Sequence, residues 1–172
     1  MYPSFIVEYG IAPHHLSKQV FVGIVKWLRE TRVEAKHTGR KLEADALKIV
    51  INRIYGALND AMDYLYDPEC TYTVTINLQL LLCGLIEAFE LNNFDVLSAN
   101  TDGLLVRLPL NRQGVFKHIC NEWSVYSKLD LETEKFEKYC RSAVNDYIAV
   151  GYGFYDALQE YNRCGVWIDS KS

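Results

Sequence analysis

The stretch that most constrains the fold is residues 94–109, in which two apolar runs flank a short polar tip. Both runs are rich in Val and Leu, and the tip reads Asn100-Thr101-Asp102-Gly103. Asn, Asp and Gly tolerate the positive φ angles of tight turns, so this pattern predicts a β-hairpin with Asp102 at its tip. A carboxylate on a rigid hairpin is suited to holding Mg2+, which prefers oxygen ligands. The alternative is a solvated turn residue, because Asp also favours turns for conformational reasons.

Apolar residues that recur at helical spacing predict a helix from residue 16 to about residue 36, with Gly39 as the stop. Its predicted buried stripe consists of Leu16, Val20, Ile24, Trp27 and Leu28. On another side of this helix, Arg29, Arg32 and Lys36 fall on one stripe. Three aligned cations form either an anion site or an ordinary solvated face.

A second helix is predicted to begin near Glu43, with a buried stripe of Leu47, Val50, Ile51, Ile54 and Leu58. Along one edge runs a line of polar residues formed by Lys48, Asn52, Tyr55 and Asn59. Because the loop 37–42 is short, the two helices are expected to lie antiparallel and to bring Arg32, Lys36 and Lys48 towards one anionic group. A nucleoside triphosphate fits, because Arg binds phosphate bidentately and Lys adds a compact charge.

The rest of the chain mixes helical and strand patterns, which predicts an α+β fold with a small antiparallel sheet backed by helices. Further helices are predicted at 74–91 and 112–126, and strands at 129–136 and 144–150. The predicted inward residues of the last helix are Val115, Phe116, Ile119 and Trp123. The length of 172 residues and the hydrophobic content of 49% suit a single domain with a sizeable core.

Charge and cysteine content narrow the function classes. The net charge of -4 argues superficially against a nucleic-acid partner, but residues 18–53 hold nine Lys or Arg and four Asp or Glu, so one segment could face phosphates. Five scattered cysteines without a CxxC pair indicate reduced thiols rather than disulfides or zinc. No apolar run approaches the ~20 residues of a membrane helix, so we expect a soluble, cytoplasmic protein without a membrane partner.

Three stretches, in the same order, resemble the polymerase motifs of family B DNA polymerases, particularly the bacteriophage type. Tyr2-Pro3-Ser4 is similar to the end of the motif Asp-x-x-Ser-Leu-Tyr-Pro-Ser. Residues 48–56 resemble Lys-x-x-x-Asn-Ser-x-Tyr-Gly, and residues 100–103 resemble Asp-Thr-Asp-Ser. Arg32 and Lys36 also resemble the Arg-x-x-x-Lys pair of the family's fingers helix. The resemblance extends over nearly the whole chain.

The chain departs from these motifs at four positions. Met1 stands at the Leu position of the first motif, and Arg53 replaces Ser in the second. In the third, Asn100 replaces the first Asp and Gly103 replaces Ser. In the family the second Asp of the third motif binds the metal, so the change at Asn100 leaves that ligand in place.

The resemblance implies a role for each matching residue. Those implied to bind the triphosphate are Arg32, Lys36 and Lys48. Asn52 and Tyr55 would line the nucleotide pocket, and Tyr2 would exclude a ribose 2'-hydroxyl. Asp102 would be the catalytic residue and a ligand of Mg2+ in a two-metal site. Residues 145–148 resemble the part of the palm that grips the primer, which makes Tyr147 either a DNA-binding residue or a core residue.

The implied architecture is a single palm and fingers fragment, with fingers helices at about 16–60 and the palm at 1–15 and 61–172. The implied function is template-directed DNA synthesis, in which dNMP is transferred to a primer 3'-hydroxyl. The implied partners are primer-template DNA and dNTP, in the cytoplasm of a bacterium or of a phage-infected host.

The family's other metal-binding Asp would lie four residues before Met1, so this chain alone is expected to be incomplete and to need an upstream polymerase fragment. For the same reason, the sheet is expected to lack part of a strand and to expose an unpaired apolar edge. Two alternatives remain open. One is a non-catalytic remnant that binds nucleotide or DNA, and the other is a structural domain with accidental motif matches.

Overall fold

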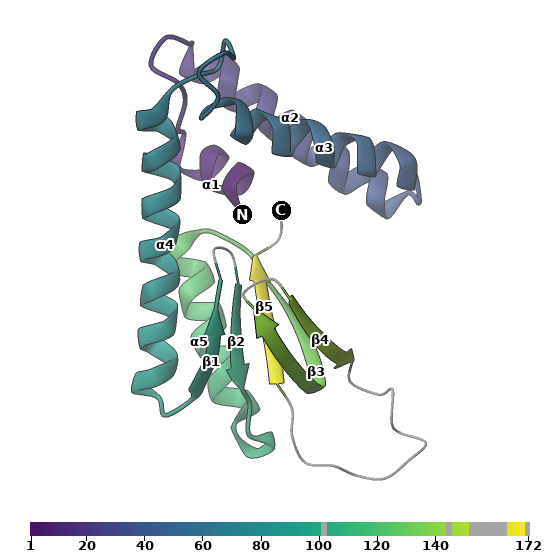
Figure 1. Cartoon of the computed structure of the whole chain (residues 1–172), viewed down its shortest axis with the longest axis vertical. Helices are drawn as coiled ribbons and strands as arrows, with labels where there is room; N and C mark the ends of the chain where they lie inside the picture. Colours follow the sequence, from purple (N-terminus) through teal and green to yellow (C-terminus); the bar gives the residue numbers. More distant parts are fainter. Residues whose placement is uncertain (101–102, 144–145, 152–164, 171–172) are drawn as a thin grey trace. The chain divides into compact units, whose positions relative to one another are not determined.

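The computed structural model describes residues 1–100, 103–143, 146–151 and 165–170 (Figure 1). The chain forms two compact units, one of residues 1–78 and the other of residues 79–171. Helices and antiparallel strands both occur, so the α+β class is confirmed. The division into fingers and palm segments stays a prediction.

The first unit is built on a helical hairpin, which consists of α2 (Lys18–His37) and α3 (Lys41–Ala57) and is packed against α1 (Tyr2–Tyr9) (Figure 1). The two long helices match the predicted ones closely. Between them Gly39 adopts a φ of +72°, a conformation that glycine reaches without a steric cost. The first polymerase-like motif lies in α1, so the expected incomplete strand is wrong. Pro3 is tolerated there because the first turn of a helix needs no backbone donor.

The buried face of α2 differs from the predicted one. Its buried residues are Phe21, Val25, Leu28, Arg32 and Ala35. Val20 and Trp27 are each 60% exposed, and Ile24 is 50% exposed, so three of the five predicted stripe residues face solvent. Both stripes have helical spacing, and they differ by one residue, which is about 100° around the axis. The packing of α1 and α3 against α2, which periodicity does not record, selects the stripe that contains Arg32.

The predicted stripe of α3 is partly confirmed. Ile51 is buried within the helix and Leu58 just beyond it, whereas Leu47 and Ile54 are half-buried. Val50 is 46% exposed and does not belong to the core. Small side chains at Ala44 and Ala57 complete the buried set of the helix.

Helix α4 (Pro68–Leu91) begins six residues before its predicted start. Asp67 caps it, because its Oδ1 accepts a hydrogen bond of 2.9 Å from the backbone N–H of Cys70. Pro68 occupies the first helical position, where a missing N–H costs nothing. The buried residues along this helix include Val74, Leu78, Leu82, Leu85 and Phe89.

Of the described helices, α4 is the one that is long and apolar enough to cross a membrane by length and composition. The expectation that no apolar run approaches such a length is therefore wrong. The same criterion is met by core helices of soluble proteins, so this is weak support for a membrane span.

In the second unit, the predicted hairpin is confirmed as β1 (Asp95–Ala99) and β2 (Gly103–Arg107). The backbone N–H of Asn100 donates to the carbonyl of Gly103 at 2.8 Å and closes the turn. A 3-10 turn, η1 (Leu110–Arg112), then leads into α5 (Gln113–Ser127). The buried residues of α5 are Phe116, Ile119, Cys120, Trp123 and Ser127. Val115 was predicted to face inward, but it is 38% exposed.

Three further strands complete one antiparallel sheet, and they are β3 (Leu131–Ala143), β4 (Asp146–Gly151) and β5 (Gly165–Ser170). The strand order is β1-β2-β5-β3-β4, so β5 lies between β2 and β3 (Figure 1). No strand was predicted for β5. The edge strands are β1 and β4.

An aromatic cluster holds the hairpin to the helices of the second unit. The Phe89 and Phe116 rings stack at 5.3 Å between centroids, and Phe94 packs edge-on against both. The Trp123 Nε1–H donates to the carbonyl of Leu81 at 2.8 Å, which fixes α5 on α4. The hairpin that ends in the third motif is therefore set on a rigid support.

The four described cysteines are free in the structure. Cys70 and Cys120 are buried, and burial raises the pKa of each thiol to about 11. Both thiols thus stay protonated near neutral pH. The two exposed cysteines are Cys83 and Cys140.

Candidate functional site

Arg29 and Lys36 lie on one flank of the buried stripe of α2. Around the helix axis, Arg29 is turned by roughly 60° and Lys36 by roughly 40° from Arg32, both in the same direction. Arg32 itself is 6% exposed, whereas Arg29 is half-buried and Lys36 is exposed. The three cations that the sequence aligns therefore run from the packed interior to the surface.

On α3, Lys48, Asn52 and Tyr55 lie beside the buried stripe. They are turned from it around the helix axis in the same direction as Arg29 and Lys36 are turned from Arg32 on α2. Antiparallel helices rotate in opposite senses when viewed from one end, so these two flanks lie on the same side of the hairpin. Arg32 lies seven residues before Gly39 and Lys48 nine residues after it, which places them within about 3 Å of each other along the axis. We call this side the cationic flank, defined by Arg29, Arg32, Lys36 and Lys48.

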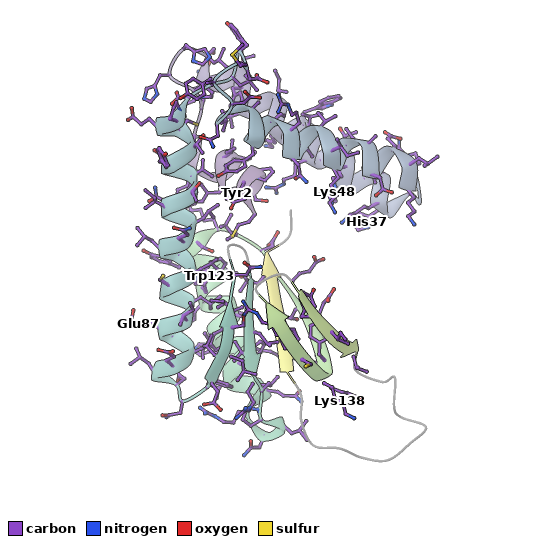
Figure 2. The ribbon with its side chains drawn as sticks, viewed as in Figure 1. Tyr2, His37, Lys48, Glu87, Trp123 and Lys138 are labelled. Carbon is purple, nitrogen blue, oxygen red and sulfur yellow. The ribbon has the colours of Figure 1, made fainter. Side chains whose placement is uncertain are left out.

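Three acidic residues of the hairpin, Glu30, Glu34 and Glu43, are engaged with other cations. Arg40 pairs with Glu43 at 2.8 Å and with Glu34 at 3.3 Å, and Lys26 lies 3.9 Å from Glu30. Within the described part of the chain, no carboxylate lies within 4.0 Å of the ammonium of Lys36 or Lys48. Figure 2 shows Lys48 on α3, with His37 at the end of α2. These two ammonium groups are thus open to an external anion.

Two predicted pocket residues from separate motifs are brought into contact. The rings of Tyr2 on α1 and Tyr55 on α3 stack with 4.1 Å between centroids and 3° between planes. Tyr2 and Tyr55 are both half-buried. Asn52 lies one turn of helix before Tyr55 and is exposed, so it continues the same edge towards Lys48.

The hydroxyl of Tyr55 is fixed by a residue that the sequence does not single out. Tyr55 Oη lies 2.6 Å from Thr75 Oγ1 on α4, and Thr75 Oγ1 donates to the carbonyl of Thr71 at 2.8 Å. A hydroxyl has one proton, which Thr75 gives to the carbonyl, so Tyr55 donates to Thr75. The ring that stacks on Tyr2 is thus held at its far end. Its partner lies in another helix, and no spacing rule points to it.

The candidate metal ligand Asp102 lies outside the described residues. Its neighbour Asn100 is half-buried at the end of the hairpin, and across the strands Arg107 pairs with Asp95 at 2.9 Å. Among the residues that the structure describes, no group of three or more His, Cys, Asp or Glu side chains could hold a metal ion. The two-metal site stays a prediction from the motif.

Tyr147 lies on the edge strand β4 and is 48% exposed, so the alternative that it is a core residue is wrong. An edge strand has a neighbour on one side, which leaves its side chains less covered. The Tyr147 ring stacks on Tyr139 at 5.2 Å, and Arg141 is its partner across the ladder. A DNA-binding role for Tyr147 stays a prediction.

Comparison with known proteins gives one partial match. Over 77 residues, which are 45% of this chain, the sequence is 31% identical to DNA polymerase II of Escherichia coli (strain K12). The match covers 10% of that protein, so the chain spans about a tenth of the length of this relative. No protein-family model matches the chain. The similarity supports a polymerase-related origin.

Proposed function

We propose that this chain is part of a family B DNA polymerase of the bacteriophage type and supplies its site for the incoming nucleotide. The observation that carries the proposal is the stack of Tyr2 on Tyr55, which joins two polymerase-like motifs. Tyr55, which joins the first motif to the second, lies on the same side of the hairpin as the cationic flank, where Lys36 and Lys48 are open to anions. The partial similarity to a DNA polymerase supports the same assignment.

In this proposal the helical hairpin is the fingers and the sheet of the second unit belongs to the palm. Lys36 and Lys48 bind the triphosphate, and Arg32 adds positive charge from the packed interior. Tyr55 and Asn52 line the nucleotide pocket, and Tyr2 excludes a ribose 2'-hydroxyl. Asp102 is the proposed ligand of Mg2+, which in such reactions stabilises the charge that develops on the transferred phosphate. Primer-template DNA is the proposed second partner, with Tyr147 as one contact.

The test of the nucleotide site is a calorimetric titration with dATP at low salt. Replacing Lys48 by Ala should weaken binding by roughly five- to ten-fold, as expected for the loss of one charged contact to phosphate. The matched control is Lys26→Ala, because Lys26 pairs with Glu30 on the outer face of the same hairpin. Binding should also weaken as salt is raised. Equal affinities of wild type and Lys48→Ala would remove Lys48 from the site.

The alternative function is a non-catalytic remnant that keeps nucleotide or DNA affinity. Both functions share the binding residues, so catalysis must separate them. The chain alone is expected not to extend a primer, because one aspartate holds two Mg2+ ions poorly.

Fusion to a segment that supplies the first-motif Asp should allow extension. In that fusion Asp102→Asn should abolish product, since the amide keeps the shape and loses the charge, and Asn100→Ala should cost much less. A folded fusion that binds primer-template and makes no product would support the remnant.

A further inference from the structure

Two segments connect the helical hairpin to the rest of the first unit, residues 10–17 before α2 and residues 58–67 after α3. They are joined to each other through His14. Its backbone N–H and its ring Nδ1 both lie 2.8 Å from Oδ2 of Asp67. Beside it, His15 Nε2 lies 2.8 Å from the carbonyl of Tyr64, and the two rings meet edge-on at 5.5 Å.

Asp67 is a firm anchor for this connection. It is 7% exposed, and a buried carboxylate needs hydrogen bonds to stay charged. Oδ1 accepts from the N–H of Cys70 at the start of α4, and the Asp67 N–H donates to the carbonyl of Leu58, both at 2.9 Å. His14, in contrast, has a side chain that is 68% exposed, so protons from solvent reach its ring freely.

We propose that His14 and Asp67 form a proton-operated latch at the base of the helical hairpin, which is tight when the His14 ring is charged and loose when it is neutral. Asp67 is a charged acceptor in both states, so the change lies in the ring: the charged imidazole adds an attraction between opposite charges to the hydrogen bond, and the neutral imidazole does not. The backbone bond from His14 survives deprotonation, so the latch loosens without being lost.

Two carboxylates face His14, Asp67 at 2.8 Å and Glu69 at 3.9 Å, and both belong to the start of α4. The hydrogen bond to Asp67, followed by the charges of Asp67 and Glu69, raises the pKa of His14 above its ordinary value of 6.5. Burial alone would raise the pKa of Asp67, but the hydrogen bonds from Cys70 and His14 and the His14 charge lower it to about 2. Asp67 therefore stays charged across the range in which His14 titrates.

The direction of the effect follows from the raised pKa. The stabilisation is complete below pH 6.5, and it is lost as the pH rises through the pKa of His14 in the folded chain. Because the pKa of His14 is raised above 6.5, the fraction of chains with a charged His14 ring changes with pH above that value. If the hairpin binds nucleotide, as the proposed function states, protons and nucleotide become coupled through its base.

The test is amide hydrogen exchange of the full chain at pH 6 and pH 8.5, expressed as protection relative to the unstructured rate at each pH. This measurement needs no nucleotide, so it stands apart from the test of the proposed function. In wild type, protection of residues 10–17 and 58–67 should fall at the higher pH, by roughly three-fold.

The decisive variant is His14→Asn, because the amide can donate to Asp67 and does not titrate in this range. It should abolish the pH dependence and keep the chain folded. The matched control, His15→Gln, should keep the wild-type pH dependence. The proposal is overturned if wild-type protection is the same at both pH values, or if the change persists in His14→Asn.

Discussion

At the scale of single residues, the orientation of the Tyr55 ring depends on one hydroxyl proton. Tyr55→Phe removes the donor and leaves Thr75 bonded to Thr71, so it should cost about 1 kcal/mol of unfolding free energy. Thr75→Val removes the acceptor from a half-buried hydroxyl and should cost more, about 1–3 kcal/mol. Urea unfolding of both variants and of the double variant measures this. Because the pair acts as a unit, the double variant should cost less than the sum, and strict additivity would contradict the described bond.

Residue spacing predicts part of the candidate site and misses the rest for a physical reason. Lys48, Asn52 and Tyr55 share one helix, so a helical repeat is enough to align them. The contacts of Tyr55 with Thr75 and of His14 with Asp67 join different segments, and periodicity carries no information on them. The capping role of Asp67, in contrast, is readable in the sequence, because an Asp before a Pro is typical of a helix start.

At the scale of elements, the presence of a helix is easier to predict from the sequence than the face that the helix buries. All the helices from α2 to α5 follow from their apolar repeats, whereas the inward face of α2 was assigned one residue away from the observed one. Neighbouring stripes of a helix with apolar residues on several sides fit the same period, and the choice depends on what packs against the helix. The place of β5 between β2 and β3 does not follow from the sequence, because both of its partners are far away along the chain.

The observed facing of α2 makes a direct prediction about stability. Phe21 is 7% exposed, so Phe21→Ala should lose about 3–5 kcal/mol through the cavity that it leaves. Trp27 is larger but 60% exposed, so Trp27→Ala should cost less than about 1 kcal/mol. Thermal unfolding of the two variants followed by circular dichroism provides the comparison. A larger loss for Trp27→Ala than for Phe21→Ala would restore the stripe predicted from the sequence.

At the scale of the whole molecule, the sheet depends on its central strand. Ile168 of β5 is paired with Leu104 on one side and with Thr133 on the other. Ile168→Pro removes a ladder donor in the middle of the sheet and should destabilise the second unit by about 3 kcal/mol or more. The control is Leu97→Pro, at the irregular register of the edge strand β1, which should cost much less. Fluorescence of Trp123 during urea unfolding, measured in a background with Trp27→Phe and Trp167→Phe, reports on this unit, and equal midpoints would speak against the central position of β5.

The position of β5 also sets the order in which the chain can be completed as it is made. The β1–β2 ladder and the β3–β4 ladder can each form as soon as their own residues have left the ribosome. They meet through β5, whose residues 165–170 are synthesised after those of the other four strands. Until then, β2 and β3 each present an unpaired edge, and such edges favour association between growing chains. The nascent protein is therefore most exposed to misassembly in the interval before those residues emerge, whatever the stability of the finished sheet.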